Sequence, residues 1–425
     1  MITNNFINKK LIQITAVVSF AALLITVLII TMPRAEVSHP SASATATATA
    51  ATEVETKAKA EAADKKAAAS LPGAGAGAGI KIIDMASREV IIDKIPEKIL
   101  AVNSASRFIT YLGAADKLCG IENIDKNFIN TRAYTIARRP EFEKLEVIGE
   151  GGYNKPLNLE KIISLKPELI FEAFCDGEAA DLLQKQCGVK VISLSYGEKS
   201  WFDEKIFFTA LNTSAGALGC ETRAAELINF VGSLNGDLAK RAATGPGAKN
   251  PGAAPRCYIG AVAFRGRQGI TSTDSMYAPF IKAGAANVVS ESSPANSHIF
   301  LDIEKLLVYD PEFIFIDAAG LATINEDYIK NKQFYARLAA VKNKKVFLCL
   351  PSVFYHLNIE TLYINSYFIG KIINPAAFED IDPAAKADEI FEKFCGRKCY
   401  ETLNKEYGAF SRLEFGENTI EIIKL

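Results

Sequence analysis

One sequence pattern occurs twice in this chain of 425 residues, and it constrains the fold more than any other feature. LNLEKIISLKPELIFEA at 157–173 aligns without gaps to LDIEKLLVYDPEFIFID at 301–317. Each copy reads as a helix, a turn bounded by proline and a buried strand. A second pair of similar segments, LGAADKLCGI at 112–121 and AGAANVVSE at 283–291, precedes the two copies in the same order. Two halves of related design are therefore predicted.

Strand and helix patterns alternate in the first half of the folded region. IKIIDMASREVII at 80–92 predicts a β-hairpin, because two alternating stretches flank a short polar turn. Strands are predicted at 98–103, 118–123, 168–174 and 190–196, and helices at 107–114, 158–165 and 178–186. Strands separated by helices of this length indicate a mostly parallel sheet that is covered on both faces.

Two consecutive helices are predicted between the halves. The first covers 203–218 and ends at Gly219, and Thr222 is the predicted N-cap of the second, with Glu226 behind it. The second helix would span ~30 Å for its roughly 20 residues. After a loop at 244–255, a second α/β series begins at RCYIGAVAF.

The predicted fold class is α/β, with two Rossmann-like lobes, mostly parallel sheets and a single long joining helix. The amino-terminal lobe is expected at 80–220, the joining helix at 221–243 and the carboxy-terminal lobe at 244–425. An N-terminal transmembrane helix and a disordered linker are expected to precede them.

The expected membrane helix is an apolar run preceded by two lysines. LIQITAVVSFAALLITVLIITM at 11–32 is long enough to cross a bilayer core of ~30 Å, and it is longer than a typical secretory signal core. We expect residues 1–32 to be an uncleaved signal-anchor, with everything after it outside the cytoplasm. No cysteine lies near the end of this run, so a lipid anchor is not expected. The Ala-, Thr- and Gly-rich residues 33–79 lack a core-forming composition and are expected to be a disordered linker.

Charge and motifs argue against several function classes. The chain has 48 Lys and Arg against 49 Asp and Glu, so no basic face for a nucleic acid is predicted. The motifs GxSxG, HExxH and Walker A are missing from the sequence, as is GxGxxG after a suitable strand, which argues against an anchored hydrolase or other enzyme. Only three histidines are present, so a zinc or manganese cage of several histidines is not expected. For Cys395 and Cys399, ordinary buried thiols are favoured over a disulfide or a soft-metal pair.

Four segments and the joining helix carry a family resemblance. The segments are DMASREVIIDKIPEKILAVNSASRFITYLGAADKLCGI, NLEKIISLKPELIFEA, ITSTDSMYAPFIKAGAANVV and the tail NIETLYINSYFIGKIINPAAFEDIDPAAKADEIFEKF. In this order, from about Ile80 to the C-terminus, the chain resembles the class III periplasmic binding proteins, which serve importers of iron-siderophores, haem, cobalamin and some molybdate. The tail resembles the iron-complex subgroup. The missing lipid-attachment cysteine and the long linker depart from the family pattern.

The resemblance implies the substrate-binding protein of an ABC importer. Such a protein captures a ferric siderophore or similar metal chelate outside the cytoplasmic membrane, and delivers it to a permease dimer with ATPase subunits. It is not an enzyme and holds no cofactor. Two alternatives remain open: a molybdate- or tungstate-binding protein of the same fold, or an anchored receptor that senses its ligand.

Candidate ligand-binding residues lie in loops that follow predicted strands, because open α/β sheets bind ligands at the carboxyl ends of their strands. The candidates are Ser104, Ser106, Arg107, Tyr153, Asp176, Arg265, Arg267, Tyr355, His356 and Asn358. Paired arginines suit carboxylate, catecholate or oxyanion groups. Tyr355 and His356 would supply O and N donors to a chelated ferric ion that is partly uncovered, whereas His298 is expected outside the site.

Each candidate also has an ordinary structural interpretation. A serine at a helix start is a common N-cap, and Asp176 is well placed to cap the next helix. Exposed arginines are often simply solvated, and His356 is equally well interpreted as a partly buried structural side chain.

Glu160 and Glu304 occupy the same place in the two repeated segments, in the first turn of a predicted helix. An acidic residue there stabilises the helix dipole by ~0.3–1 kcal/mol, which alone would explain both. The family resemblance implies a second role, in which each glutamate contacts a basic pocket on one of two permease subunits.

Overall fold

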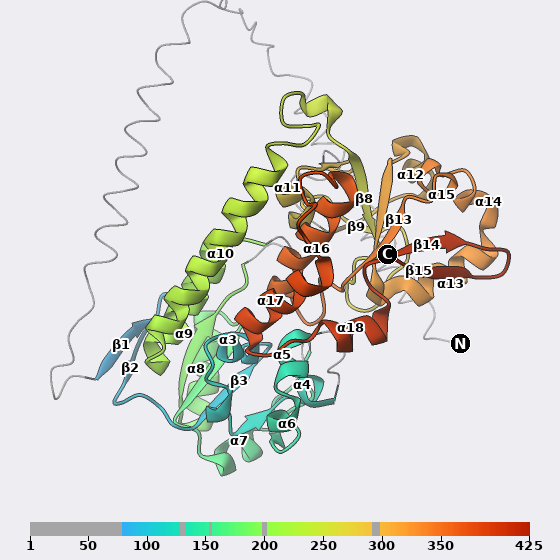
Figure 1. Cartoon of the computed structure of the whole chain (residues 1–425). Helices are drawn as coiled ribbons and strands as arrows, with labels where there is room; N and C mark the ends of the chain where they lie inside the picture. Colours follow the sequence, from blue (N-terminus) through green and yellow to red (C-terminus); the bar gives the residue numbers. More distant parts are fainter. Residues whose placement is uncertain (1–78, 128–131, 153–154, 198–201, 291–297) are drawn as a thin grey trace, which may run out of the picture. The chain divides into compact units, whose positions relative to one another are not determined.

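The two copies of the repeated sequence begin with the same capped helix (Figure 1). The computed structural model describes residues 79–127, 132–152, 155–197, 202–290 and 298–425. Helices α7 (Leu159–Leu165) and α12 (Ile303–Tyr309) have equal lengths. In each helix the residue before the first turn, Asn158 or Asp302, accepts a hydrogen bond from a backbone N–H of that turn. These side-chain caps satisfy donors that a helix start leaves unpaired.

The two repeated helices also end alike. Lys166 (φ 52°) and Asp310 (φ 36°) both have left-handed backbone conformations, which stop the helices. Each turn leads into a buried parallel strand, β6 (Leu169–Ala173) or β12 (Phe313–Asp317). The repeat predicted from the sequence is therefore a structural repeat.

The first sheet is parallel. Its strand order is β3-β6-β7, with β3 at Ile99–Val102 and β7 at Lys190–Leu194. The short parallel pair β4 (Gly120–Ile121) and β5 (Glu146–Val147) continues beside β3 through a bridge between Ile99 and Leu118. The associated helices are α3 (Ser106–Tyr111), η1 (Ala115–Lys117), α4 (Asn123–Asn127), α5 (Ala133–Ala137), α6 (Arg139–Phe142) and α8 (Gly177–Cys187). The predicted hairpin is confirmed as β1 (Ile80–Ile83) and β2 (Glu89–Ile92).

The second sheet is mixed. Its order is β10-β8-β12-β13-β14-β15, in which β10, β8, β12 and β13 are parallel and the last two pairings are antiparallel. The new strands are β8 (Arg256–Gly260), β10 (Ala286–Asn287), β13 (Val346–Cys349), β14 (Ser411–Phe415) and β15 (Ile420–Lys424), with a separate antiparallel pair β9 (Ser272–Asp274) and β11 (His298–Phe300). The helices are η2 (Pro251–Ala253), α11 (Ala278–Ala283), η3 (Ala318–Gly320), α13 (Leu321–Lys330), α14 (Lys332–Tyr335), α15 (Ala339–Lys342), α16 (Ile359–Ile373), α17 (Pro383–Cys395) and α18 (Tyr400–Tyr407). The prediction of an α/β fold with mostly parallel strands is confirmed.

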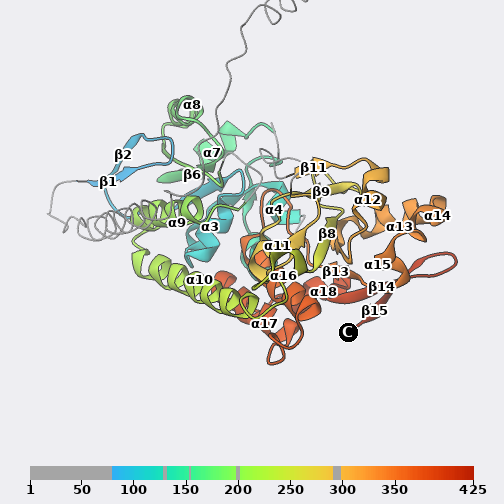
Figure 2. The ribbon, with the colours of Figure 1, turned by 90° about the horizontal axis from the view of Figure 1, so that it is seen from above.

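Helices α9 (Glu204–Leu218) and α10 (Glu221–Ala242) connect the two sheets along the chain. Gly219 (φ 66°) ends α9 as predicted. The predicted N-cap at Thr222 is wrong, because the carbonyl of Cys220 already accepts the first helical hydrogen bond of α10. At 22 residues α10 is about 33 Å long, and it contacts α9 and α11, as Figures 1 and 2 show.

Residues 77–425 form one compact unit, and the boundaries predicted inside it, at 220 and 243, stay predictions. The expected anchor at 1–32 lies outside the described residues, and so does the expected linker at 33–79 except for Gly79. Within the described ranges, no helix is long and apolar enough to cross a membrane.

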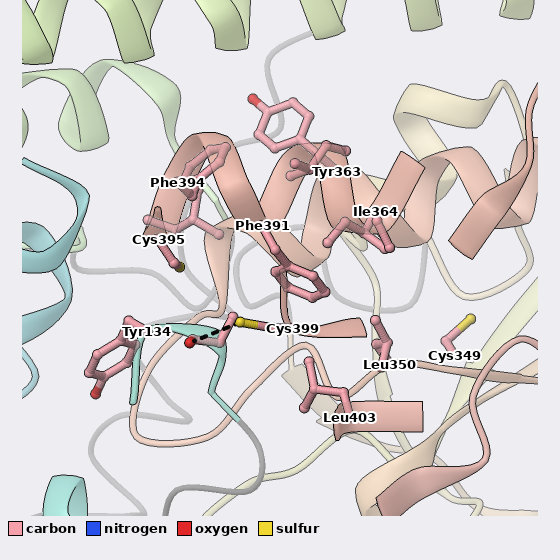
Figure 3. Close-up of a cluster of buried hydrophobic side chains, with 14 of the residues drawn as sticks. Tyr134, Cys349, Leu350, Tyr363, Ile364, Phe391, Phe394, Cys395, Cys399 and Leu403 are labelled. Atoms are coloured by element: carbon pink, nitrogen blue, oxygen red, sulfur yellow. Dashed lines mark hydrogen bonds between the residues drawn. The ribbon is translucent and has the colours of Figure 1, made fainter. Parts of the chain in front are cut away.

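A buried cluster joins α5 of the first half to α16, α17 and α18 of the second (Figure 3). Phe391 and Phe394 of α17 are fully buried in it, as is Tyr134 of α5. Cys395 and Cys399 are free thiols in this cluster. They do not share a helix, because α17 ends at Cys395. The interpretation of both cysteines as buried thiols agrees with this placement.

We expect Gly370→Ala in α16 to destabilise the fold, although alanine favours a helix over glycine by ~1 kcal/mol. A Cβ at position 370 would overlap the ring of Phe378, which is fully buried and has little room to move. Overpacking of this kind costs about 1–3 kcal/mol. Gly232→Ala in α10 is the matched control, because nothing lies within 4 Å of its Cβ position, and it should stabilise by ~0.5–1 kcal/mol. Urea unfolding measures both, and a Gly370→Ala variant as stable as the wild type would contradict this packing.

Candidate ligand-binding site

The loops that follow β3 and β13 are in contact, although about 250 residues separate them. Ser104 Oγ donates a hydrogen bond to the carbonyl oxygen of Tyr355 at 3.0 Å. Arg107 donates to the carbonyl of Leu357 and, at 3.0 Å, to Oδ1 of Asn358. Because both loops lie at carboxyl ends of parallel strands, where open α/β sheets bind ligands, their junction is the candidate site.

The guanidinium of Arg107 is fully buried at this junction. Its carbon lies 5.0 Å from the ring centre of Tyr134 and 5.5 Å from that of Tyr196, and its Nε has no hydrogen-bond partner among the described residues. The sequence predicted that Arg107 would bind an anion. In the structure its terminal nitrogens donate to the opposite loop, so a ligand contact by Arg107 stays a prediction.

Two carboxyl groups lie beside the junction and share Asn103. The backbone N–H of Asn103 donates to Glu122 at 3.0 Å, and its side-chain amide donates to Glu172 at 3.1 Å. The hydroxyl of Tyr355 lies 3.2 Å from Glu122. Burial, with the nearby charge of Asp125, raises the pKa of Glu122 to about 8, so its carboxyl holds a proton at neutral pH.

Three near-parallel aromatic rings, those of Phe174, Tyr196 and His356, lie together at the junction. We call this group the first ring stack. The ring of His356 lies 3.7 Å from that of Phe174 and 5.3 Å from that of Tyr196. Phe174 and Tyr196 are 5.2 Å apart with an interplanar angle of 1°. Burial lowers the pKa of His356 to about 3, and the charge of Arg107 adds to this effect. The imidazole is therefore neutral, and Phe174, 44% exposed, presents the stack to solvent.

Left-handed backbone conformations gather in these loops. They are Asn103 (φ 54°) and Ser104 (73°) after β3, Phe174 (61°) after β6, Ala261 (62°) and Arg265 (51°) after β8, and Tyr355 (47°) and His356 (76°) after β13. A non-glycine residue in this region is uncommon and costs of order 1–3 kcal/mol. Such strain is typical of binding and catalytic loops, and here it marks the same end of both sheets.

Arg265 and Arg267 are exposed in the loop after β8. This loop leaves the same sheet edge as the loop of Tyr355 and His356, because β8, β12 and β13 are parallel neighbours. The expectation that His298 lies outside the ligand site stays a prediction. Its ring stacks on Phe264 of the arginine loop at 4.2 Å.

The remaining candidates have separate positions. Asp176 caps α8 by accepting a hydrogen bond from the backbone N–H of Ala179 at 2.8 Å, which is its ordinary structural role. Ser106 Oγ donates to the buried carboxylate of Asp125. Tyr153 lies outside the described residues.

Comparison with known proteins places the fold. The sequence model of the family described as periplasmic binding protein matches residues 103–353, more than half of the chain. The chain belongs to this family. The family resemblance read from the sequence is thereby confirmed.

One curated relative is an uncharacterized ABC transporter substrate-binding lipoprotein of Bacillus subtilis (strain 168), which is 28% identical over 165 residues. That match covers 38% of this chain and only 46% of the relative's length. Function therefore does not transfer with the match.

Solved structures share the fold. A periplasmic solute-binding protein of Veillonella parvula is 17% identical with a TM-score of 0.60, over 77% of this chain and 96% of that chain. A molybdate periplasmic binding protein of Haemophilus influenzae, bound to molybdate, is 18% identical with a TM-score of 0.59, over 75% and 98%. A Helicobacter pylori protein with Ni(II) bound is 19% identical with a TM-score of 0.53, over 76% and 98%. Such identities establish the fold alone.

Sequence reasoning missed four residues of the candidate site: Asn103, Glu122, Phe174 and Tyr196. Each lies in the last two residues of a predicted strand. The observed strands end one or two residues earlier, at Val102, Ile121, Ala173 and Leu194. Predicted strands that ended at these residues would have placed all four side chains in the loops at the carboxyl ends of the strands, where ligand-binding residues are expected.

We expect Glu122→Gln to flatten the dependence of stability on pH. The folded chain keeps the Glu122 proton up to a pKa of about 8, whereas an unfolded glutamate loses it near ~4.3. The folded state therefore binds the extra proton, and stability present at low pH is lost as the pH rises through this window. The slope is at most ~1.4 kcal/mol per pH unit. Urea unfolding at several pH values measures it, with the exposed Glu326→Gln as control; equal slopes for wild type and Glu122→Gln would contradict the buried, protonated carboxyl.

Proposed function

We propose that this chain is the extracytoplasmic substrate-binding protein of an ABC importer, and that it captures a metal chelate of the ferric-siderophore type. Family membership supports the transport role. One observation carries the choice of ligand: the first ring stack, which presents the exposed ring of Phe174 beside buried Arg107. Flat rings bind planar organic groups by stacking, and a cation beside them favours an anionic ligand.

A bare oxyanion fits this junction less well. Molybdate would need several free N–H donors, but the terminal nitrogens of Arg107 already donate to the opposite loop. The carboxyl groups of Glu122 and Glu172 already accept hydrogen bonds from the backbone and side-chain N–H donors of Asn103, which a small dianion placed there would need. An organic chelator spreads its negative charge and offers apolar surface to the rings.

Tyr355 and His356 are the proposed donors to a ferric ion that its chelator leaves partly uncovered. The neutral imidazole of His356 keeps a lone pair for a metal, and the phenol of Tyr355 would exchange its contact with Glu122 for the metal. The metal is cargo in this proposal, and no cofactor or enzymatic step is involved. The other residues of the proposed site are Ser104, Ser106, Tyr153, Asp176, Arg265, Arg267 and Asn358.

The proposed partners are a permease dimer with its ATPase subunits, and the proposed location is the outer side of the cell membrane. Residues 1–32 would attach the protein through their apolar run, and a lipid anchor like that named for the Bacillus subtilis relative is not proposed. Glu160 and Glu304 are both exposed, each in the first turn of a repeated helix, as docking to two related subunits requires.

The ligand class is tested by titrating the purified chain, by calorimetry, with a ferric tris-catecholate, a ferric hydroxamate, haemin, cobalamin and sodium molybdate. We expect a ferric chelate to bind with a Kd of about 1 μM or tighter, which is ~8 kcal/mol. Phe174→Ala should weaken that binding at least tenfold, because the exposed ring of the stack is lost. Binding of molybdate in preference to every chelate would overturn the proposal.

Replacing both Glu160 and Glu304 by lysine should leave chelate affinity nearly intact and reduce uptake strongly in cells. Exposed charges at an interface steer association and fix orientation, so the loss should depend on salt. The two helix starts should lose at most ~1–2 kcal/mol of stability. Uptake and affinity are measured on the same double variant. Normal uptake would reduce both glutamates to helix-starting residues, and lost affinity would mean that the site is misplaced.

A further inference from the structure

A second group of aromatic rings is formed by Phe264 in the loop after β8 and by His298 and Phe300 of β11, which pairs with β9. The ring of His298 stacks on Phe264 at 4.2 Å with an interplanar angle of 9°, and Phe300 stands edge-on to His298 at 5.0 Å. Phe264 is 38% exposed and Phe300 57% exposed. The guanidinium of Arg265 lies 5.5 Å over the Phe264 ring. Exposed rings with a cation over them form a surface suited to an aromatic anion.

The hydrogen bonds around His298 determine which of its ring nitrogens carries the proton. Ser272 Oγ donates its single proton to the carbonyl of Val262 at 2.6 Å. The 2.8 Å contact between Ser272 Oγ and His298 Nε2 must therefore be a bond donated by the imidazole. Burial lowers the pKa of His298, so the ring is neutral. Its Nδ1 consequently carries a lone pair that can accept a hydrogen bond.

The position of these rings relates them to the candidate site. Phe264 belongs to the loop after β8, and His356 of the first ring stack belongs to the loop after β13. The strand order β8-β12-β13 is parallel throughout, so both loops leave the same edge of the sheet. Neighbouring strands lie ~4.8 Å apart, which separates the two strand ends by about 10 Å.

We propose that Phe264, His298 and Phe300 form a second ligand subsite, which takes one aromatic arm of the chelate while another arm packs on the first ring stack. The second subsite rests on the proposed function. It restricts the ligand to chelators with at least two aromatic, anionic arms, such as catecholates, and disfavours aliphatic hydroxamates. The rings hold the arm by stacking, Arg265 supplies positive charge, and Nδ1 of His298 accepts from an amide N–H of the arm. A protein partner would need a face of about 800 Å² on each side, far more than three rings offer.

The test compares two ferric complexes on the full chain and on the Phe264→Ala/Phe300→Ala double variant. We expect the double variant to bind a ferric tris-catecholate at least tenfold more weakly than the wild type does, with little change for a ferric hydroxamate. Phe300→Ala alone should lose part of this affinity; its exposed side chain makes it the variant least able to disturb folding. Ile329→Ala, which removes a 49% exposed side chain from α13, is the matched control and should change neither affinity.

The outcomes separate the two proposals. A wild type that binds the tris-catecholate tightly, with a double variant of equal affinity, overturns the second subsite and leaves the proposed function standing. Equal losses for catecholate and hydroxamate also overturn it, because they would show a general effect on the site. A wild type that binds no ferric chelate overturns the proposed function, and the subsite with it.

Discussion

The candidate site depends on the hydrogen bonds that the buried guanidinium of Arg107 donates to the opposite loop. Removing an ion from water costs several kcal/mol unless acceptors replace the lost hydration. Here the acceptors are the carbonyl of Leu357 and the amide oxygen of Asn358, from the loop that begins α16. Glu360, also fully buried, accepts from Tyr111 of α3. Its carboxyl lies near enough for the charge of Arg107 to act on its pKa, against a larger upward effect of burial. The cation comes from the first half of the chain and its acceptors from the second.

This distribution of partners has a structural consequence. Separating the loops of α3 and α16 would remove the two acceptors that the second half supplies to Arg107. It would also leave Glu360 without its nearby cation and without the hydroxyl of Tyr111. Leaving one partner of a buried polar pair alone costs more than the pair contributes. The loops are thus held together before any ligand arrives. The left-handed residues among them, such as Ser104 and His356, can then keep backbone conformations that an isolated loop would abandon.

How far the sequence predicts this molecule depends on how local each feature is. The repeated helices α7 and α12 were predictable, because caps such as Asn158 and Asp302 lie within a few residues of the turns they start. The end of α9 at Gly219 was predictable for the same reason. The N-cap of α10 was placed two residues too late, since the carbonyl of Cys220 accepts the first helical hydrogen bond.

The candidate site was less predictable, because its geometry is set by contacts across the chain. The side chain of Asn103 forms hydrogen bonds with Glu172 and Tyr355, and its left-handed φ ends β3 one residue before the predicted end of the strand. No local pattern reports that conformation. Tyr355 and His356 were still predicted, because they lie in the loop that follows β13, and open α/β sheets bind ligands at the carboxyl ends of their strands. The proximity of His298 to the arginine loop has no local signal in the sequence, because the pairing of β9 with β11 brings the two together.

The charge of the site changes in the pH range in which a cell surface works. Below about pH 8 the carboxyl of Glu122 is protonated. Arg107, Arg265 and Arg267 then carry the positive charge of the junction and of the neighbouring loop, with less opposition from acidic groups. Above that pH, Glu122 ionises beside Tyr355, and an anionic chelate meets a negative group next to the proposed metal donor. The same ionisation would favour a hydrogen bond donated by Tyr355 to Glu122, and so hold the phenol away from the metal. Both effects act in one direction, so we expect capture of the proposed anionic chelate to weaken as the pH rises and Glu122 ionises.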